Sequence, residues 1–240
     1  MTNQTMTSKG PGAKSSVVLY QLKGKDYVRS APKLFKTLNI ENAKGYQLTL
    51  AYLISKTIRQ HLHSIIPHPS DVEMQNLLRT EVLEYVSCGC KDSDAWITHA
   101  SLIDDFRFSN RGLTENNKWV SKIRIRRKSS RRLEIKIPSF VPAKSIQAPW
   151  HTYKVLCKIA ISVCYRKTGA SVDNIVTEFG FPFDNVKIPA LTIPLELKTP
   201  KMSIVITGLG MKFRTTHKYA LHKEEADKCF QSAIIHTLGV

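Results

Sequence analysis

The spacing of hydrophobic residues along the chain changes near residue 87. Over residues 40–66, apolar side chains recur every three or four positions, which predicts an amphipathic helix that Pro67 ends. Residues 71–86 repeat the pattern, and Ser70 and Glu73 have the spacing of a capping box. The short proline-containing link predicts that the two helices pack as an αα-hairpin. The predicted buried faces consist of Ala43, Tyr46, Leu50, Ile54, Ile58, Leu62 and Ile65 in the first helix and Met74, Leu77, Leu78, Val82 and Tyr85 in the second.

After residue 87 the hydrophobic period becomes two, which is typical of strands. The predicted strands cover residues 96–108, 119–126, 132–137, 153–166, 174–179, 186–197, 202–215 and 230–238, and two short strands precede the helices at 17–22 and 27–29. We therefore predict an α+β fold, with an N-terminal strand pair and an αα-hairpin followed by an antiparallel β-sandwich of about seven strands. The predicted segments are a flexible basic arm at 1–16, the strand pair plus helical hairpin at 17–90, and the β-sandwich at 91–240.

Composition adds a strong and uneven positive charge to this picture. The chain has 240 residues, 42% of them hydrophobic, and a formal net charge of +17. Residues 1–36 carry +6, 37–120 carry −2, 121–137 carry +7 and 138–240 carry +6. The five cysteines do not suggest a disulfide framework, and the sequence contains no apolar leader and no run of about 18 apolar residues. We expect a cytoplasmic protein with no membrane span.

The charge is most concentrated in residues 121–137, where eight Lys and Arg residues accompany the single acid Glu134. Apolar and charged residues alternate through both halves of this segment, which predicts a hairpin connected by residues 128–131. The apolar face would consist of Ile123, Ile125, Leu133, Ile135 and Ile137. The opposite face would present cations to solvent.

A cationic ribbon favours a polyanionic partner, most directly nucleic acid, because neutralised phosphates release counterions. RNA, DNA, anionic lipid and an acidic protein are all compatible with the charge. The predicted contacts are Lys122, Arg124, Arg126, Arg127, Lys128, Arg131 and Arg132, together with the arm at 1–16. A second hypothesis is a structural subunit of a homo-oligomeric shell, tube or fibre, because long proline-punctuated strands and a flexible arm suit assembly.

Few residues have a pattern typical of catalysis. Cys88 and Cys90 could bind a metal or form a redox pair, but strong zinc motifs contain two such pairs. Asp92 and Asp94 could bind Mg²⁺, which leaves a metal-dependent enzyme as a minority alternative. Nothing in the sequence pairs them with a nucleophile or a phosphate-binding loop. We therefore expect a non-enzymatic protein with no cofactor and no metal.

The remaining reactive side chains have simpler interpretations. Cys157 and Cys164 lie in a predicted strand, where they are expected to be small core residues. His61, His63 and His68 lie at the end of the first helix. Helical positions two apart point about 200° from each other, so His61 and His63 cannot share a ligand, and we expect a surface role for these histidines.

Residues 27–33, Tyr-Val-Arg-Ser-Ala-Pro-Lys, are followed by the long predicted helix and then by the proline-containing link to Met74 and Gln75. This order resembles the N-terminal part of small uncharacterised basic proteins from Bacteroidetes, over about the first 90 residues. The resemblance implies a bacterial, non-secreted and non-catalytic protein, and it carries over no catalytic residue.

Overall fold

The computed structural model describes residues 17–22, 25–30, 43–67, 71–89, 100–109, 117, 119–216 and 230–240. The chain divides into two compact units, residues 1–42 and residues 43–240. In the first unit, β1 (Val17–Leu22) and β2 (Lys25–Ser30) pair antiparallel. This confirms the predicted strand pair, with the second strand longer at both ends than expected.

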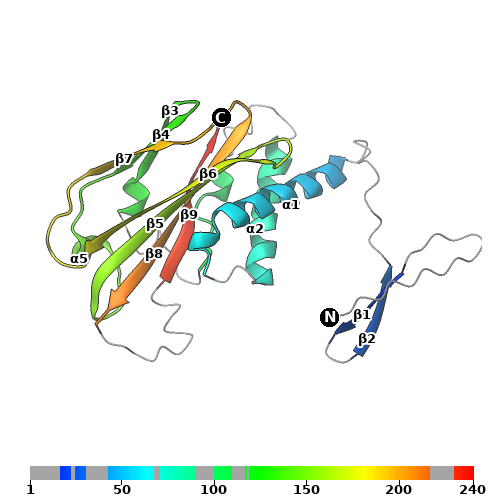
Figure 1. Ribbon diagram of the computed structural model, residues 1–240, viewed down its shortest axis with the longest axis horizontal. Coiled ribbons are helices and arrows are strands. Elements are labelled where there is room, and N and C mark those ends of the chain that lie inside the picture. Colours follow the sequence, from blue (N-terminus) through cyan, green and yellow to red (C-terminus); the bar gives the residue numbers. More distant parts are fainter. Residues whose placement is uncertain are drawn as a thin grey trace, which may run out of the picture. The chain divides into compact units, whose positions relative to one another are not determined.

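The second unit is a mixed α+β structure made mostly of sheet (Figure 1). Its described helices are α1 (Ala43–His61), α2 (Val72–Gly89) and the short α5 (Pro142–Ser145), with 3-10 turns η1 (His63–Ile65), η2 (Ala100–Ile103) and η3 (Val120–Lys122). Its described strands are β3 (Arg124–Ser129), β4 (Arg132–Ile137), β5 (Thr152–Tyr165), β6 (Ser171–Pro182), β7 (Leu191–Glu196), β8 (Ser203–Thr215) and β9 (Phe230–Gly239). They form two antiparallel sheets, with the strand orders β3-β4-β7 and β6-β5-β8-β9.

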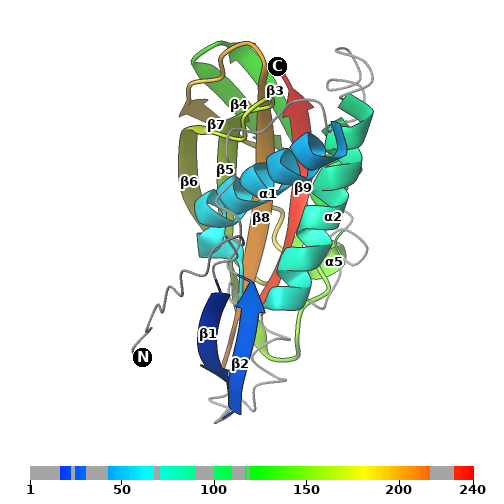
Figure 2. The same ribbon diagram turned by 90° about the vertical axis from the view of Figure 1, so that its right-hand side faces the viewer.

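The four-stranded sheet has buried side chains on both faces. Figure 2 shows α1 and α2 lying across one of these faces. Along β5, Val155 and Ile159 belong to a hydrophobic cluster shared with the three-stranded sheet. Ala160 and Cys164 point to the other face and belong to a second cluster, shared with α1 and α2. Side chains alternate between the faces of a strand, so one central strand contributes to both clusters. The helices therefore belong to one compact unit with the strands of residues 124–239.

Two glycines of β8 allow the helical layer to approach the sheet closely. A Cβ atom on Gly208 would overlap Ile65 Cδ1, and one on Gly210 would lie 3.0 Å from Ile65 Cβ. Ile65 is fully buried at this position. The next two residues of β8 on the same face, Lys212 and Arg214, are exposed. The helical layer therefore covers this part of β8 only as far as Gly210.

The helices form where the hydrophobic period predicts them, with two corrections. Asp71 caps α2, because its Oδ1 accepts the backbone N–H of Glu73 at 2.9 Å and that of Met74 at 3.2 Å. Ser70, the predicted cap, lies outside the described residues. The prediction that Leu77 faces the core was wrong: it is 55% exposed. It lies about 100° around the helix from Leu78, which is on the buried stripe.

The strand predictions were correct for β4, β5, β6, β8 and β9 apart from their ends. Residues 100–103 form the turn η2 and not part of a strand, and only Arg107 makes an isolated bridge, to Ala233 of β9. The segment predicted to begin at residue 119 starts as the turn η3 and becomes extended at β3. β7 begins at Leu191 and not at residue 186, because Pro189 interrupts the preceding segment.

The turn between β5 and β6 packs directly on α1. The Thr57 hydroxyl donates to the carbonyl of Gly169 at 2.8 Å, and the Tyr46 hydroxyl donates to the carbonyl of Lys167 at 2.8 Å. Gly169 has a φ of 66°, and a Cβ atom on it would lie 2.8 Å from the backbone nitrogen of Ile54. Only glycine suits this combination of left-handed backbone and close approach.

Candidate nucleic-acid interface

The basic hairpin, residues 121–137, contributes the edge strand β3 and the central strand β4 of the three-stranded sheet. The strands β3 and β4 pair through Ile125↔Ile135, and both of these side chains are buried against the four-stranded sheet. The turn consists of Ser130 and Arg131 alone, so the connection is shorter than the predicted 128–131. The alternation of the sequence therefore produces a ribbon with one face buried and one in solvent.

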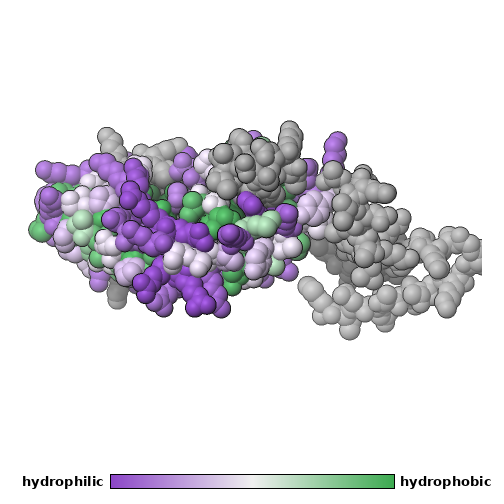
Figure 3. Space-filling model, turned by 90° about the horizontal axis from the view of Figure 1, so that it is seen from above, coloured by the Kyte–Doolittle hydropathy of each residue, from purple (hydrophilic) through white to green (hydrophobic). Residues whose placement is uncertain are grey.

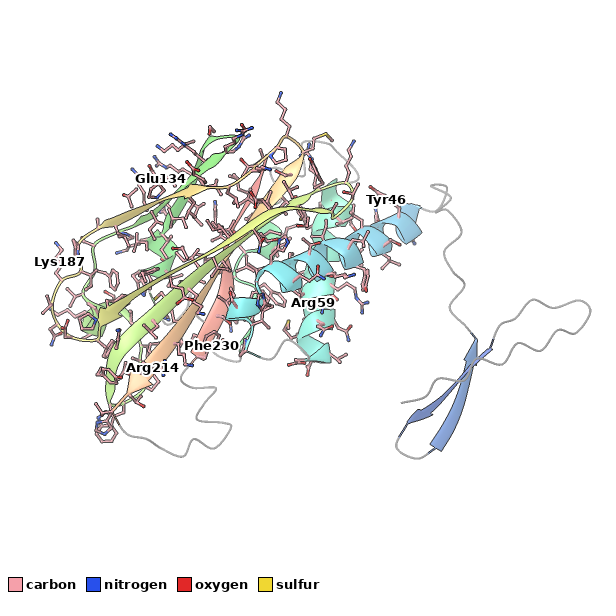
Figure 4. The ribbon with its side chains drawn as sticks, in the orientation of Figure 1. Tyr46, Arg59, Glu134, Lys187, Arg214 and Phe230 are labelled. Carbon is pink, nitrogen blue, oxygen red and sulfur yellow. The ribbon has the colours of Figure 1, made fainter. Side chains whose placement is uncertain are left out.

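The solvent face places like charges directly opposite each other. Arg124 pairs with Lys136 across the two strands, and Arg126 pairs with Glu134. The Glu134 carboxylate lies 3.6 Å from Lys128 Nζ and 3.4 Å from Lys136 Nζ. Glu134, labelled in Figure 4, is thus shared between two lysines of the hairpin. Most of the positive charge on this face remains uncompensated within the described residues.

Arg127 differs from the other predicted contact residues. It pairs with Leu133, whose side chain is buried, so Arg127 lies on the core side of the ribbon. Its Nε donates to Thr199 Oγ1 at 3.0 Å, and a terminal nitrogen donates to the Thr199 carbonyl at 2.8 Å. The register then steps to Ser129↔Arg132, which leaves Lys128 as an extra, bulged residue. Arg127 therefore links the hairpin to the segment before β8.

The tip of the hairpin borders a hollow of about 620 Å³. Arg131, Arg132 and Lys198 line it with Asp173, Glu196 and Leu197. Arg132 lies opposite Glu196 in the sheet, and the backbone N–H of Lys198 donates to Asp173 Oδ2 at 2.9 Å. The hollow therefore has both signs of charge, with Asp173 and Glu196 beside the hairpin residues Arg131 and Arg132.

All seven predicted contact residues have exposed side chains. Lys122 belongs to the turn η3, just before β3, and Arg124 donates to the carbonyl of Ser121 at 2.8 Å. Figure 3, seen from above Figure 1, shows hydrophilic side chains gathered over much of this face of the molecule. The arm at 1–16 and its predicted contribution lie outside the described residues.

The other candidates from the sequence are not brought together. Cys88 is a half-buried free thiol, whereas Cys90, Asp92 and Asp94 lie outside the described residues. Within the part of the chain that the structure describes, no group of three or more His, Cys, Asp or Glu side chains could hold a metal ion. Cys157 and Cys164 are buried free thiols, as predicted, and burial raises the pKa of Cys164 to about 12.

Two titratable groups are more buried than the sequence suggested. His61 lies between Ser162 Oγ, 2.8 Å from its Nδ1, and Ser171 Oγ, 3.0 Å from its Nε2. Burial lowers the pKa of His61, although the nearby charge of Asp173 opposes that shift. Burial also raises the pKa of Asp104. Neither hydroxyl near His61 could have been found from spacing, because both serines lie about a hundred residues away in the sequence.

No family model matches this chain, and no curated protein matches it. None of the described helices is both long enough and apolar enough to cross a membrane.

Proposed function

We propose that this protein is a non-enzymatic, cytoplasmic nucleic-acid-binding protein whose basic hairpin contacts the phosphate backbone. The observation that carries the proposal is the pairing of Arg124 with Lys136 on the solvent face of the hairpin. Like charges opposite each other destabilise a sheet. A bound polyanion would remove this cost by placing phosphates between the cations. The proposal takes Arg126, Lys128, Arg131 and Arg132 as the main contacts, with Lys122 and Arg124 beside them.

The ribbon is suited to positioning phosphates and not to reading base sequence. Its cations lie on neighbouring strands, and its buried isoleucines fix the backbone that carries them. We infer that the two sheets form a β-sandwich, with an αα-hairpin on its outer side, and that this arrangement holds the ribbon rigid. A rigid row of cations follows a regular backbone charge and carries no sequence information by itself.

The test is the salt dependence of binding to a labelled duplex DNA. Replacing Arg126, Arg131 and Arg132 with Ala should reduce the slope of log affinity against log salt by about 2 to 3, because each lost phosphate contact contributes about 0.9. The matched control replaces Lys56, Lys144 and Lys187 with Ala, which removes the same charge from exposed positions away from the hairpin. Equal slopes for the wild type and the hairpin variant, with both proteins folded, would reject the proposal.

A structural subunit is the second candidate, because β6 leaves one edge of the four-stranded sheet unpaired within the described residues. β6 is 12 residues long, and Val176 in its middle is 39% exposed. A long open edge can pair with a strand of another copy. Replacing Thr177 with Pro should then convert a defined oligomer into monomers, as measured by light scattering after size exclusion. A monomeric wild type would exclude this candidate.

A further inference from the structure

A second cationic surface lies on the four-stranded sheet, at the end that the helices leave open. On the helix-side face of β5 and β8, Lys154 pairs with Arg214 and Leu156 pairs with Lys212. Lys158 follows on β5 and forms an ion pair of 2.7 Å with Glu178 of β6. These side chains belong to the face whose other end contacts α1. Lys158 pairs with Gly210, where Ile65 packs, and Lys154, Lys212 and Arg214 lie beyond that point. We call Lys154, Lys158, Lys212 and Arg214 the open sheet face.

The open sheet face is far from the basic hairpin. The hairpin tip approaches the last residues of β5, because Asp173, which pairs with Val163, accepts from the backbone of Lys198. Lys154 and Arg214 lie at the first residues of β5 and the last of β8 (Figure 4). Val163 lies nine residues after Lys154 on β5, so about 30 Å of strand separates the hairpin tip from the start of β5. The two surfaces can therefore be altered separately.

Exposed aromatic rings lie at the same end of the sheet. Trp150 is 87% exposed, which is unusual for an indole, and its ring stacks on that of His151 with 4.7 Å between ring centroids and 8° between planes. His151 has a left-handed φ of 59°, and its carbonyl accepts the backbone N–H of Thr216 at 3.1 Å. The strained turn holds one face of the indole against the imidazole and leaves the other in solvent. Tyr153, two residues further, is half exposed.

We propose that this end of the molecule binds single-stranded nucleic acid, with a base stacked on Trp150 and phosphates on the open sheet face. Lys154, Lys212 and Arg214 form no ion pair within the described residues, and cations two residues apart on a strand are spaced by about 6.6 Å. Flat rows of cations beside a free aromatic face are the combination that single-strand binders use. This proposal rests on the proposed function because it also takes nucleic acid as the polyanion. It differs in that the binding surface is not the hairpin and the nucleic acid is single-stranded.

The experiment compares two labelled oligonucleotides of equal length, one of thymidines and one abasic, by fluorescence anisotropy. Trp150→Ala should weaken binding of the thymidine strand by about 5- to 100-fold, because stacking is lost, and leave the abasic strand unchanged. Trp150→Phe keeps an aromatic ring and should bind the thymidine strand nearly as tightly as the wild type. This variant tests stacking even if the alanine variant does not fold. Replacing Lys154, Lys212 and Arg214 with Ala should weaken both strands and reduce the salt slope by about 2. The control is again the variant lacking Lys56, Lys144 and Lys187.

The outcomes separate this inference from the proposed function. If the hairpin variant loses binding while the Trp150 and open-sheet variants bind both strands normally, the second surface is rejected and the proposed function stands. If the wild type binds neither oligonucleotide nor duplex, both are rejected. Binding to vesicles that contain phosphatidylserine is measured as a third experiment. If Trp150→Ala loses vesicle binding but binds the thymidine strand as the wild type does, the surface binds membranes and the proposal is wrong.

Discussion

The contact between the β5–β6 turn and α1 makes Gly169 a position where an added side chain cannot be accommodated. In Gly169→Ala, the new Cβ atom would lie 2.8 Å from Ile54 N and 2.8 Å from Leu53 Cβ, both fixed by the helix. The backbone of Gly169 also has a left-handed φ of 66°. The substitution therefore combines a strained backbone with a steric clash that no rotamer change can relieve.

The size of the effect follows from these two contributions. Left-handed backbone costs a residue with a Cβ about 1 to 2 kcal/mol, and overpacking costs about 1 to 3 kcal/mol. Gly169→Ala should therefore lower the free energy of unfolding by about 2 to 5 kcal/mol. This is a large part of the total of about 5 to 15 kcal/mol that is typical of a domain. With a urea slope of about 2 kcal/mol per molar, the urea midpoint falls by about 1 to 2.5 M.

Urea unfolding followed by far-UV circular dichroism measures the change. Gly169→Asn separates the two contributions, because Asn tolerates left-handed backbone but introduces the same Cβ atom. Thr57→Val is a second control, which removes the hydrogen bond to the Gly169 carbonyl and adds no clash, at a cost of about 1 to 3 kcal/mol. A loss of less than about 1 kcal/mol in both Gly169 variants would show that the turn does not pack on α1 as described.

Three further predictions concern charged groups. Arg127→Ala should lower stability by about 1 kcal/mol through the lost bonds to Thr199, yet leave the salt slope of DNA binding unchanged; a reduced slope would show that Arg127 contacts phosphate. Because burial lowers the pKa of His61 below 6.5, its contribution to stability is present above that pH and is lost as the pH falls below it. The difference in melting temperature between the wild type and His61→Gln should be smaller at pH 5.5 than at pH 7.5. An equal difference at both pH values would contradict this prediction. Burial raises the pKa of Asp104 above 3.8, so ionisation at neutral pH destabilises the fold. The melting temperature of Asp104→Asn should therefore be higher than that of the wild type at pH 7 and equal to it near pH 3.5. A lower melting temperature of the variant at pH 7 would refute this prediction.

Local periodicity predicted most of the secondary structure, because the helices and the two hairpin strands each bury one face. The alternation of Ile125 with arginines located the hairpin, and the three-to-four spacing from Leu50 to Ile65 located α1. The errors occurred where a tertiary contact or a turn decided the structure. Residues 100–103 are a turn beside β9, although their apolar composition suggested a strand.

The open sheet face could not be predicted from the sequence, because its cations come from strands about fifty residues apart. The alternation that placed Lys154 and Lys158 on one face of β5 was visible, but the pairing with Arg214 and the limit of the helical layer were not. Alternation with Ile123 and Ile125 already places Arg127 on the core side of the hairpin, but its bonds to Thr199, 72 residues away, have no local signal. Pairing register is a property of the folded sheet and has no local signal.

The two-residue alternation of the hairpin has a consequence for how this protein can vary. One residue inserted just after Arg124 would reverse the face of every later residue in that strand. Ile125 would then point to solvent and Arg126 to the core. Exchanging Arg for Lys at an outward position changes nothing in the packing. Homologous sequences should therefore differ freely in which cation each outward position carries, while the number of residues in the two arms stays constant.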